Sequence, residues 1–116
     1  MASPYSQTEG SSGVYTATLL DESGEAVTAL DTLRVWLRDV ASGQIINSRN
    51  GQSLLNENGG AFSAGVLTWT MSPDDHAIIG SSAIERHEAV FEAVWDATKA
   101  KTWRVYFDVT NFVPIT

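Results

Sequence analysis

The sequence predicts an all-β protein, a single antiparallel β-sandwich with one short helical turn near residues 73–79. Short runs of residues alternate between apolar and polar side chains, which is the period of a strand with one buried face. Turn signals rich in Gly, Asn and Asp separate these runs at intervals of roughly ten residues. No long helical segments alternate with the strands, which argues against a parallel α/β fold. The 116 residues fit one domain.

A hairpin over residues 87–111 is the clearest element. Two alternating runs flank a short polar link, residues 98–101, as expected of two antiparallel strands. His87 is interpreted as an edge histidine at the start of the first strand. We expect the inner face of the hairpin to belong to the core, namely Phe91, Trp95, Trp103, Val105, Phe107 and Val109.

Strands are also expected in four earlier segments, at residues 14–20, 32–39, 44–48 and 64–71. The segment 32–39 shows the pattern best, because Leu33, Val35 and Leu37 share one face. Residues 49–60 are predicted to be a loop, since Asn-Gly and Gly-Gly pairs mark turns. Two leucines inside it, Leu54 and Leu55, are expected to pack against the core as a small strand.

The helical turn is predicted from its start signals. Ser72 suits the N-cap, Pro73 suits the first helical position, and Asp75 follows the cap by three residues. The cluster Asp74, Asp75 and His76 also offers ligands for a divalent cation. Adjacent residues on a helical turn diverge, so we interpret the cluster as a helix start with acidic residues favoured by the helix dipole.

Both ends of the chain are polar or extended. Residues 1–13 form a predicted extended N-terminal arm whose anchors are Pro4 and Tyr5, residues 14–111 form the sandwich, and residues 112–116 form an extended C-terminal tail. The arm lacks the basic and apolar regions of a secretory signal. No apolar run approaches the ~18 residues of a membrane helix.

Composition excludes several classes of function. The net charge of −7 argues against nucleic acid as the main partner, because such binding needs Lys and Arg to neutralise phosphates. It also disfavours an anionic membrane surface. The absence of cysteine excludes disulfides, thiolate zinc sites and cysteine nucleophiles.

Sequence patterns give no catalytic site. His87 with Glu85, Arg86 and Glu88 is a candidate acid–base group, but catalysis needs a positioned pair in a pocket. His87 and Glu88 are neighbours on a strand, so their side chains point to opposite faces and cannot act together directly. The sequence lacks both the calcium-loop pattern and the phosphate-binding glycine loop. We therefore expect a protein that is not an enzyme, with no cofactor and no metal.

The exposed aromatic residues are the stronger functional signal. Trp36 lies between Arg34 and Arg38 on the polar face of its strand, and Tyr106 lies on the outer face of the hairpin. Trp and Arg are enriched among the residues that dominate binding energy in interfaces. Trp36 is therefore a candidate contact anchor; stacking on a sugar ring and partial burial under a loop are the alternatives. We expect partner contacts at Pro4, Tyr5, Arg34, Trp36, Arg38, Tyr106, Val113 and Ile115.

Over residues 30–111 the order of motifs resembles the immunoglobulin-like β-sandwich domains of tailed-bacteriophage virion proteins, including the N-terminal domain type of baseplate upper proteins. The segments that carry the resemblance are LRVWLRD, GVLTWTMSPDDHAI, HEAVFEAVW and TWRVYFDVTN. The matching positions are Gly65, Asp74 or Asp75, Phe91, Phe107 and Val109.

The resemblance implies a non-enzymatic structural component of the virion. Such a component would decorate the capsid or belong to the neck, tail or baseplate, in many symmetric copies beside other virion proteins. The alternative is a carbohydrate-binding β-sandwich that uses Trp36 and Tyr106 as stacking platforms.

Overall fold

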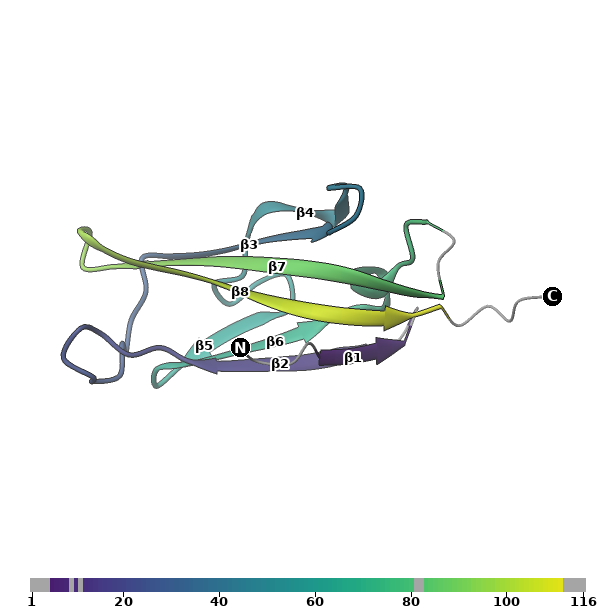
Figure 1. Cartoon of the computed structure of the whole chain (residues 1–116). Helices are drawn as coiled ribbons and strands as arrows, with labels where there is room; N and C mark the ends of the chain where they lie inside the picture. The colour runs from purple at the N-terminus through teal and green to yellow at the C-terminus, as the bar shows by residue number, and fades with distance from the viewer. Residues whose placement is uncertain (1–4, 9, 11, 81–82, 112–116) are drawn as a thin grey trace.

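Two β-sheets pack face to face in the computed structural model of the chain, which describes residues 5–8, 10, 12–80 and 83–111 (Figure 1). The larger sheet has the order β1-β8-β7-β3-β4. Its strands are β1 (Tyr5–Thr8), β3 (Thr32–Asp39), β4 (Ile45–Ser53), β7 (Ile84–Trp95) and β8 (Lys99–Thr110). The smaller sheet has the order β2-β6-β5 and consists of β2 (Gly13–Thr18), β5 (Gly60–Ser63) and β6 (Val66–Met71). These sheets confirm the predicted all-β sandwich.

The core lies between the two sheets and is built around Phe91. The Phe91 ring stacks on Tyr15 at 5.3 Å and on Trp103 at 5.1 Å between ring centroids, and Trp69 meets it edge-on at 5.6 Å. Leu33, which lies on β3, is fully buried, as predicted from the alternation of that strand. Aromatic pairs in these geometries add about 0.5–1.5 kcal/mol each beyond the area that they bury.

Strand β7 is the centre of the larger sheet, and this position corrects two expectations. It pairs with β3 on one side and with β8 on the other, so His87 is fully buried rather than at an edge. Trp95 on β7 and Trp103 and Val105 on β8 are only half-buried, although we expected them in the core. All three pack against the core, and Trp103 lies on the open side of the sandwich, where a pocket lies between β2 and β8.

The expected loop at residues 49–60 is wrong in its first part, whereas residues 54–59 do form a loop. Strand β4 continues to Ser53, and β5 begins at Gly60. Turn-type residues occur inside β4 because its pairing with β3 contains register shifts, and Gly51 has a φ of +72°. The expected strand at 64–71 also starts later, because Ala64 and Gly65 form the tight turn between β5 and β6 with φ values of +51° and +83°.

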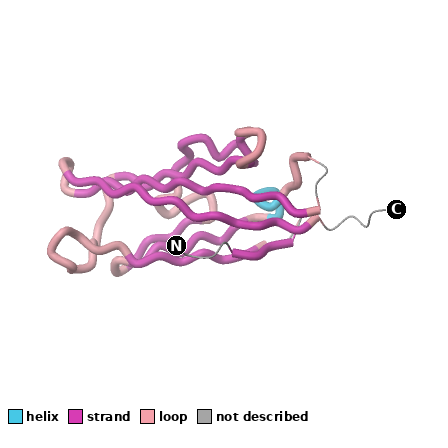
Figure 2. The backbone as a smooth tube through the Cα atoms, in the orientation of Figure 1, coloured by secondary structure: helices cyan, strands magenta, loops and turns pink. Residues whose placement is uncertain are grey.

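The helical turn is a 3-10 turn, η1 (Pro73–His76), shorter than the predicted segment 73–79 (Figure 2). Its start matches the sequence signal, because the Ser72 N–H donates a hydrogen bond of 2.8 Å to Asp75 Oδ2. Within the described residues no helix is long and apolar enough to cross a membrane.

Part of the predicted N-terminal arm belongs to the larger sheet. Strand β1 lies beside β8 and runs parallel to it, with Tyr5 opposite Phe107 and Thr8 opposite Thr110. This is the one parallel pair among the described strands; all the others are antiparallel, as predicted. The side chain of Gln7 approaches Gly13 at the start of β2, so β1 also reaches the smaller sheet.

Candidate interaction surface

The outer face of the larger sheet brings together the predicted contact residues of the sandwich. Because successive side chains of a strand alternate between the two faces, β3, β7 and β8 each present every second residue outward. The register places Arg38 opposite Glu88, and Glu88 opposite Tyr106. We call this surface the outer arginine face; its members are Arg34, Trp36, Arg38, Arg86, Glu88, Val90, Glu92, Thr102, Arg104, Tyr106 and Asp108.

Glu88 holds the middle of the outer arginine face together. Its side chain is only 3% exposed, and its two carboxylate oxygens accept from Arg38 Nε at 2.8 Å and from Arg104 Nη1 at 3.3 Å. Burial alone would raise the pKa of Glu88, but hydrogen bonds from Arg38 and Tyr106 and the charges of both arginines hold this pKa below its usual range. One carboxylate thereby orients two arginines and the tyrosine. In sequence, Glu88 looked like one more outward charge, and its burial was not predicted.

A second ion pair lies on the same face but is more exposed. Arg86 binds Asp108 with two hydrogen bonds of 2.8 and 3.1 Å, and its side chain is 51% exposed. The pKa of Asp108 is lowered by the hydrogen bond and charge of Arg86. Water screens such pairs, so this one orients side chains more than it stabilises the fold.

The outer arginine face is positive on an acidic chain. Four of the seven Lys and Arg residues lie on it, Arg34, Arg38, Arg86 and Arg104. Against these four positive charges stand three carboxylates, Glu88, Glu92 and Asp108, which leaves a formal charge of +1 on a chain of −7. The face is therefore suited to a neighbour that carries negative charge.

Trp36 is half-buried beside β4. A Cβ atom placed on Gly51 would lie 3.2 Å from Trp36 Cζ2, so the backbone of β4 packs directly on the indole ring. The structure thus agrees with partial burial, under a strand rather than a loop. The rest of the side chain remains accessible on the outer arginine face.

The outer face of the smaller sheet has the opposite character. Its outward residues are uncharged and small or β-branched. They are Val14, Thr16, Thr18, Ala61, Ser63, Val66, Thr68 and Thr70. Val14 is 62% exposed and Val66 is 37% exposed. Charge and aromatic side chains are thus concentrated on one of the two faces of the sandwich.

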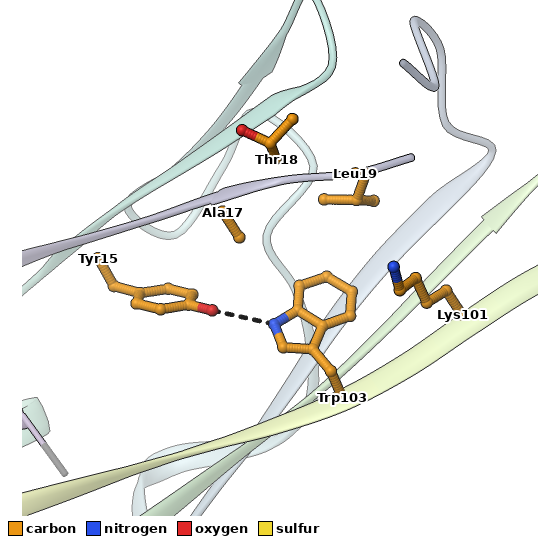
Figure 3. A pocket seen from close by; sticks show the side chains of 6 residues that line it. All are labelled: Tyr15, Ala17, Thr18, Leu19, Lys101 and Trp103. Carbon is orange, nitrogen blue, oxygen red and sulfur yellow. Dashed lines mark hydrogen bonds between the residues drawn. The ribbon is translucent and has the colours of Figure 1, made fainter. Parts of the chain in front are cut away.

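The open side of the sandwich contains a pocket between β2 and β8 (Figure 3). Trp103 Nε1 donates a hydrogen bond of 3.1 Å to the Tyr15 hydroxyl across this opening, and Lys101 lies at its rim. The pocket has a volume of about 270 Å³, and it contains no group suited to acid–base chemistry beyond one tyrosine and one lysine.

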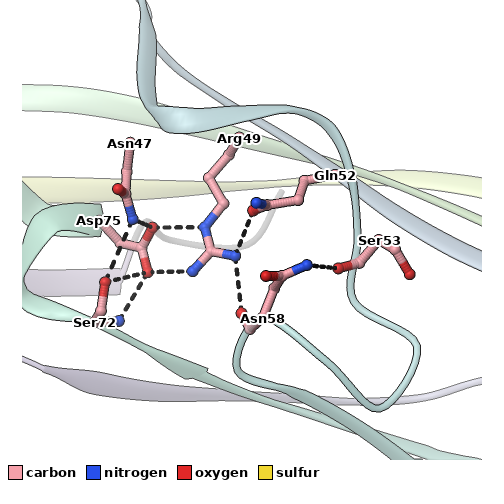
Figure 4. A network of polar contacts seen from close by, with 7 residues as sticks. All are labelled: Asn47, Arg49, Gln52, Ser53, Asn58, Ser72 and Asp75. Carbon is pink, nitrogen blue, oxygen red and sulfur yellow. Dashed lines mark hydrogen bonds and ion pairs between the residues drawn. The ribbon is translucent and has the colours of Figure 1, made fainter.

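The cluster at η1 is a structural element rather than a convergent metal site. Asp75 is fully buried and accepts two hydrogen bonds from Arg49, at 2.8 Å and 2.9 Å, and one from Asn47 at 2.9 Å (Figure 4). Burial would raise the pKa of Asp75, but these bonds and the charge of Arg49 lower it. Asp74 is exposed, while His76 is buried beside Phe107, so the three side chains diverge as expected.

His87 has a carboxylate partner, Glu85, which belongs to the acid–base group considered from the sequence. His87 Nε2 lies 2.9 Å from Glu85 Oε1, and both side chains are buried. Residues two apart on a strand share a face, so the spacing itself could have indicated this pair. Burial would raise the pKa of Glu85, but backbone N–H groups of Ile79 and Gly80 and the bond to His87 lower it.

The remaining predicted contact residues lie near the ends of the chain. Tyr5 begins β1, while Pro4, Val113 and Ile115 lie outside the described residues. Comparison of the sequence with known protein families and with curated proteins gives no match.

Proposed function

We propose that this chain is a non-enzymatic structural protein of a tailed-phage virion, in which the outer arginine face contacts neighbouring subunits. The observation that carries the proposal is the concentration of four arginines, Trp36 and Tyr106 on one face of an acidic molecule. The resemblance of residues 30–111 to immunoglobulin-like virion domains gives the setting.

Three properties of the face favour a protein partner. Arg, Trp and Tyr are the side chains most often found at binding hot spots. The ion pairs to Glu88 fix Arg38 and Arg104 before a partner arrives, so less side-chain entropy is lost on binding. The face is positive while the whole chain is negative, so another copy, or another acidic virion subunit, would complement it.

Charge reversal tests the proposal. Arg34 is exposed on the outer arginine face, and Lys101 is exposed at the rim of the pocket on the open side. Arg34→Glu and Lys101→Glu each replace +1 by −1, so both change the net charge from −7 to −9. Each variant is co-produced with the wild-type chain during phage growth, and the ratio of the two chains in purified particles is measured by mass spectrometry.

We expect Arg34→Glu to be depleted from particles at least about tenfold, because a hot-spot change of about 2 kcal/mol exceeds the ~1.4 kcal/mol that corresponds to tenfold. Lys101→Glu should enter particles like the wild type, and both variants should melt at nearly the wild-type temperature. Equal incorporation of the two variants would contradict the role of the face. Absence of the wild-type chain from particles would contradict the virion setting.

Carbohydrate binding is the second candidate, since Trp36 and Tyr106 lie on the same face. Its signature differs from that of subunit contact: the isolated chain would bind a glycan array, and Trp36→Ala would abolish that binding.

A further inference from the structure

A second polar cluster lies at the end of the larger sheet, where β3 ends and β7 begins. Asp39, Glu85 and His87 each offer a ligand atom, and these atoms lie within 4.8 Å of one another. All three side chains are more than nine-tenths buried, at 5%, 7% and 0% exposure. The register brings them together because Asp39 lies opposite His87, and Glu85 shares the face of His87.

Every other buried carboxylate among the described residues forms an ion pair with an arginine, but Asp39 and Glu85 do not. Asp75 binds Arg49, and Glu88 binds Arg38 and Arg104. Neither Asp39 nor Glu85 forms an ion pair with Lys or Arg, although all seven of these residues lie in the described chain. Buried charges are normally paired or bound to a metal, so two neighbouring carboxylates beside one imidazole mark a deficit of positive charge.

The other contacts of the cluster orient the side chains without neutralising them. Asp39 Oδ2 accepts from the Ser42 N–H at 3.1 Å and from the Ser42 hydroxyl at 2.7 Å. Glu85 accepts from the backbone N–H groups of Ile79 and Gly80. Nδ1 of His87 is buried and has no hydrogen-bond partner among the described residues, so the contact of Nε2 with Glu85 is the one that fixes the ring. Such contacts resemble the outer shell that orients metal ligands.

An open pocket gives solvent access to the two carboxylates. Asp39 and Glu85 line it together with residues 40–42, Ile79, Gly80, Ile84 and Arg86, and its volume is about 520 Å³. His87 lies behind them in the core. A cation held by all three side chains would therefore keep a coordination position toward solvent, which water can fill.

We propose that Asp39, Glu85 and His87 bind one divalent transition-metal ion, with zinc as the best fit. Two carboxylate oxygens and one imidazole nitrogen are a ligand set that zinc accepts, whereas calcium and magnesium prefer oxygen alone. Zinc binds such ligands at about 2.0–2.2 Å, so two ligands of one ion lie at most ~4.4 Å apart. A small rotation of one carboxylate brings the 4.8 Å cluster into this range. On binding, the ion replaces the proton between His87 and Glu85.

Zinc titration of the full chain tests the site. After treatment with a chelator, the protein is titrated with zinc chloride and followed by calorimetry and thermal melting, with magnesium chloride as the comparison. We expect one zinc ion per chain and a melting temperature that rises with zinc and not with magnesium. Asp39→Asn and Glu85→Gln keep the shape of the side chains and should weaken zinc binding at least about tenfold. Glu92→Gln removes the same charge on the outer arginine face and should bind zinc as the wild type does.

A crystal soaked in zinc gives a measurement that does not depend on whether the variants fold. We expect one anomalous-scattering peak within bonding distance of Asp39, Glu85 and His87. A peak elsewhere, no saturable binding, or equal binding by Glu85→Gln and Glu92→Gln would overturn the proposal.

Discussion

Arg49 shows how a single residue can tie separate segments of the sandwich together. Its side chain is 6% exposed, and its guanidinium group binds Asp75 of η1 through two nitrogens, while Nη1 donates to Gln52 Oε1 and to the Asn58 carbonyl oxygen (Figure 4). The same group lies 5.4 Å from the centre of the Trp69 ring. One side chain therefore joins β4, η1, β6 and the segment before β5. We expect its removal to lower the stability of the whole fold.

Arg49→Met should lower the free energy of unfolding by about 3–5 kcal/mol, because Asp75 would stay buried without its cation. Arg86→Met is the matched control, since its ion pair with Asp108 is exposed and contributes only about 0–1 kcal/mol. Urea unfolding of both variants measures the difference. Equal losses of unfolding free energy in the two variants would show that the buried ion pair contributes no more to stability than the exposed one. The double variant Arg49→Met with Asp75→Leu should recover part of the loss, because it leaves no unpaired charge.

The strands differ in how clearly their sequence predicts them. β3, β7 and β8 keep a period of two over most of their length, so most of their inner faces could be predicted from residue type. β4 contains Asn-Gly and a charged arginine, which favour a loop until Asp75, far away in sequence, is known to bind that arginine. β5 has four residues, too few to give a period.

The candidate sites also differ in how far the sequence predicts them. The outer arginine face was predictable in part, because Arg34, Trp36 and Arg38 lie on one strand and alternation alone places them together. The burial of Glu88 and the meeting of Asp39 with His87 depend on the pairing of β3 with β7, which no local pattern reveals.

Gly60, the first residue of β5, packs directly against the backbone of Leu54. A Cβ atom at Gly60 would lie 2.0 Å from the Leu54 carbonyl oxygen, and Leu54 is fully buried. Gly60→Ala should therefore cost about 1–3 kcal/mol or more of unfolding free energy, because backbone must move. Gly13→Ala is the control, since its Cβ would meet only the flexible side chain of Gln7. It should be neutral or stabilise by up to ~1 kcal/mol, and thermal melting that ranks the two variants the other way would refute the packing argument.

The two outer faces of the sandwich carry different kinds of side chain. The larger sheet presents arginines and two aromatic side chains, and the smaller sheet presents uncharged threonines and valines. Strand β1 pairs with the last four residues of β8, Phe107–Thr110, and so covers this end of the β8 edge. An exposed strand edge invites pairing with other chains. The chain itself thus covers part of this edge, while the outer arginine face stays free in the described structure.

Radical footprinting of the chain, free and in purified particles, tests whether the outer arginine face is the contact surface, because it measures the solvent access of individual side chains. We expect Trp36 and Tyr106 to lose most of their reactivity on assembly, while Val14 and Val66 on the smaller sheet keep theirs. Unchanged reactivity of Trp36 and Tyr106, or protection of Val14 and Val66 alone, would contradict the assignment of the outer arginine face as the contact surface.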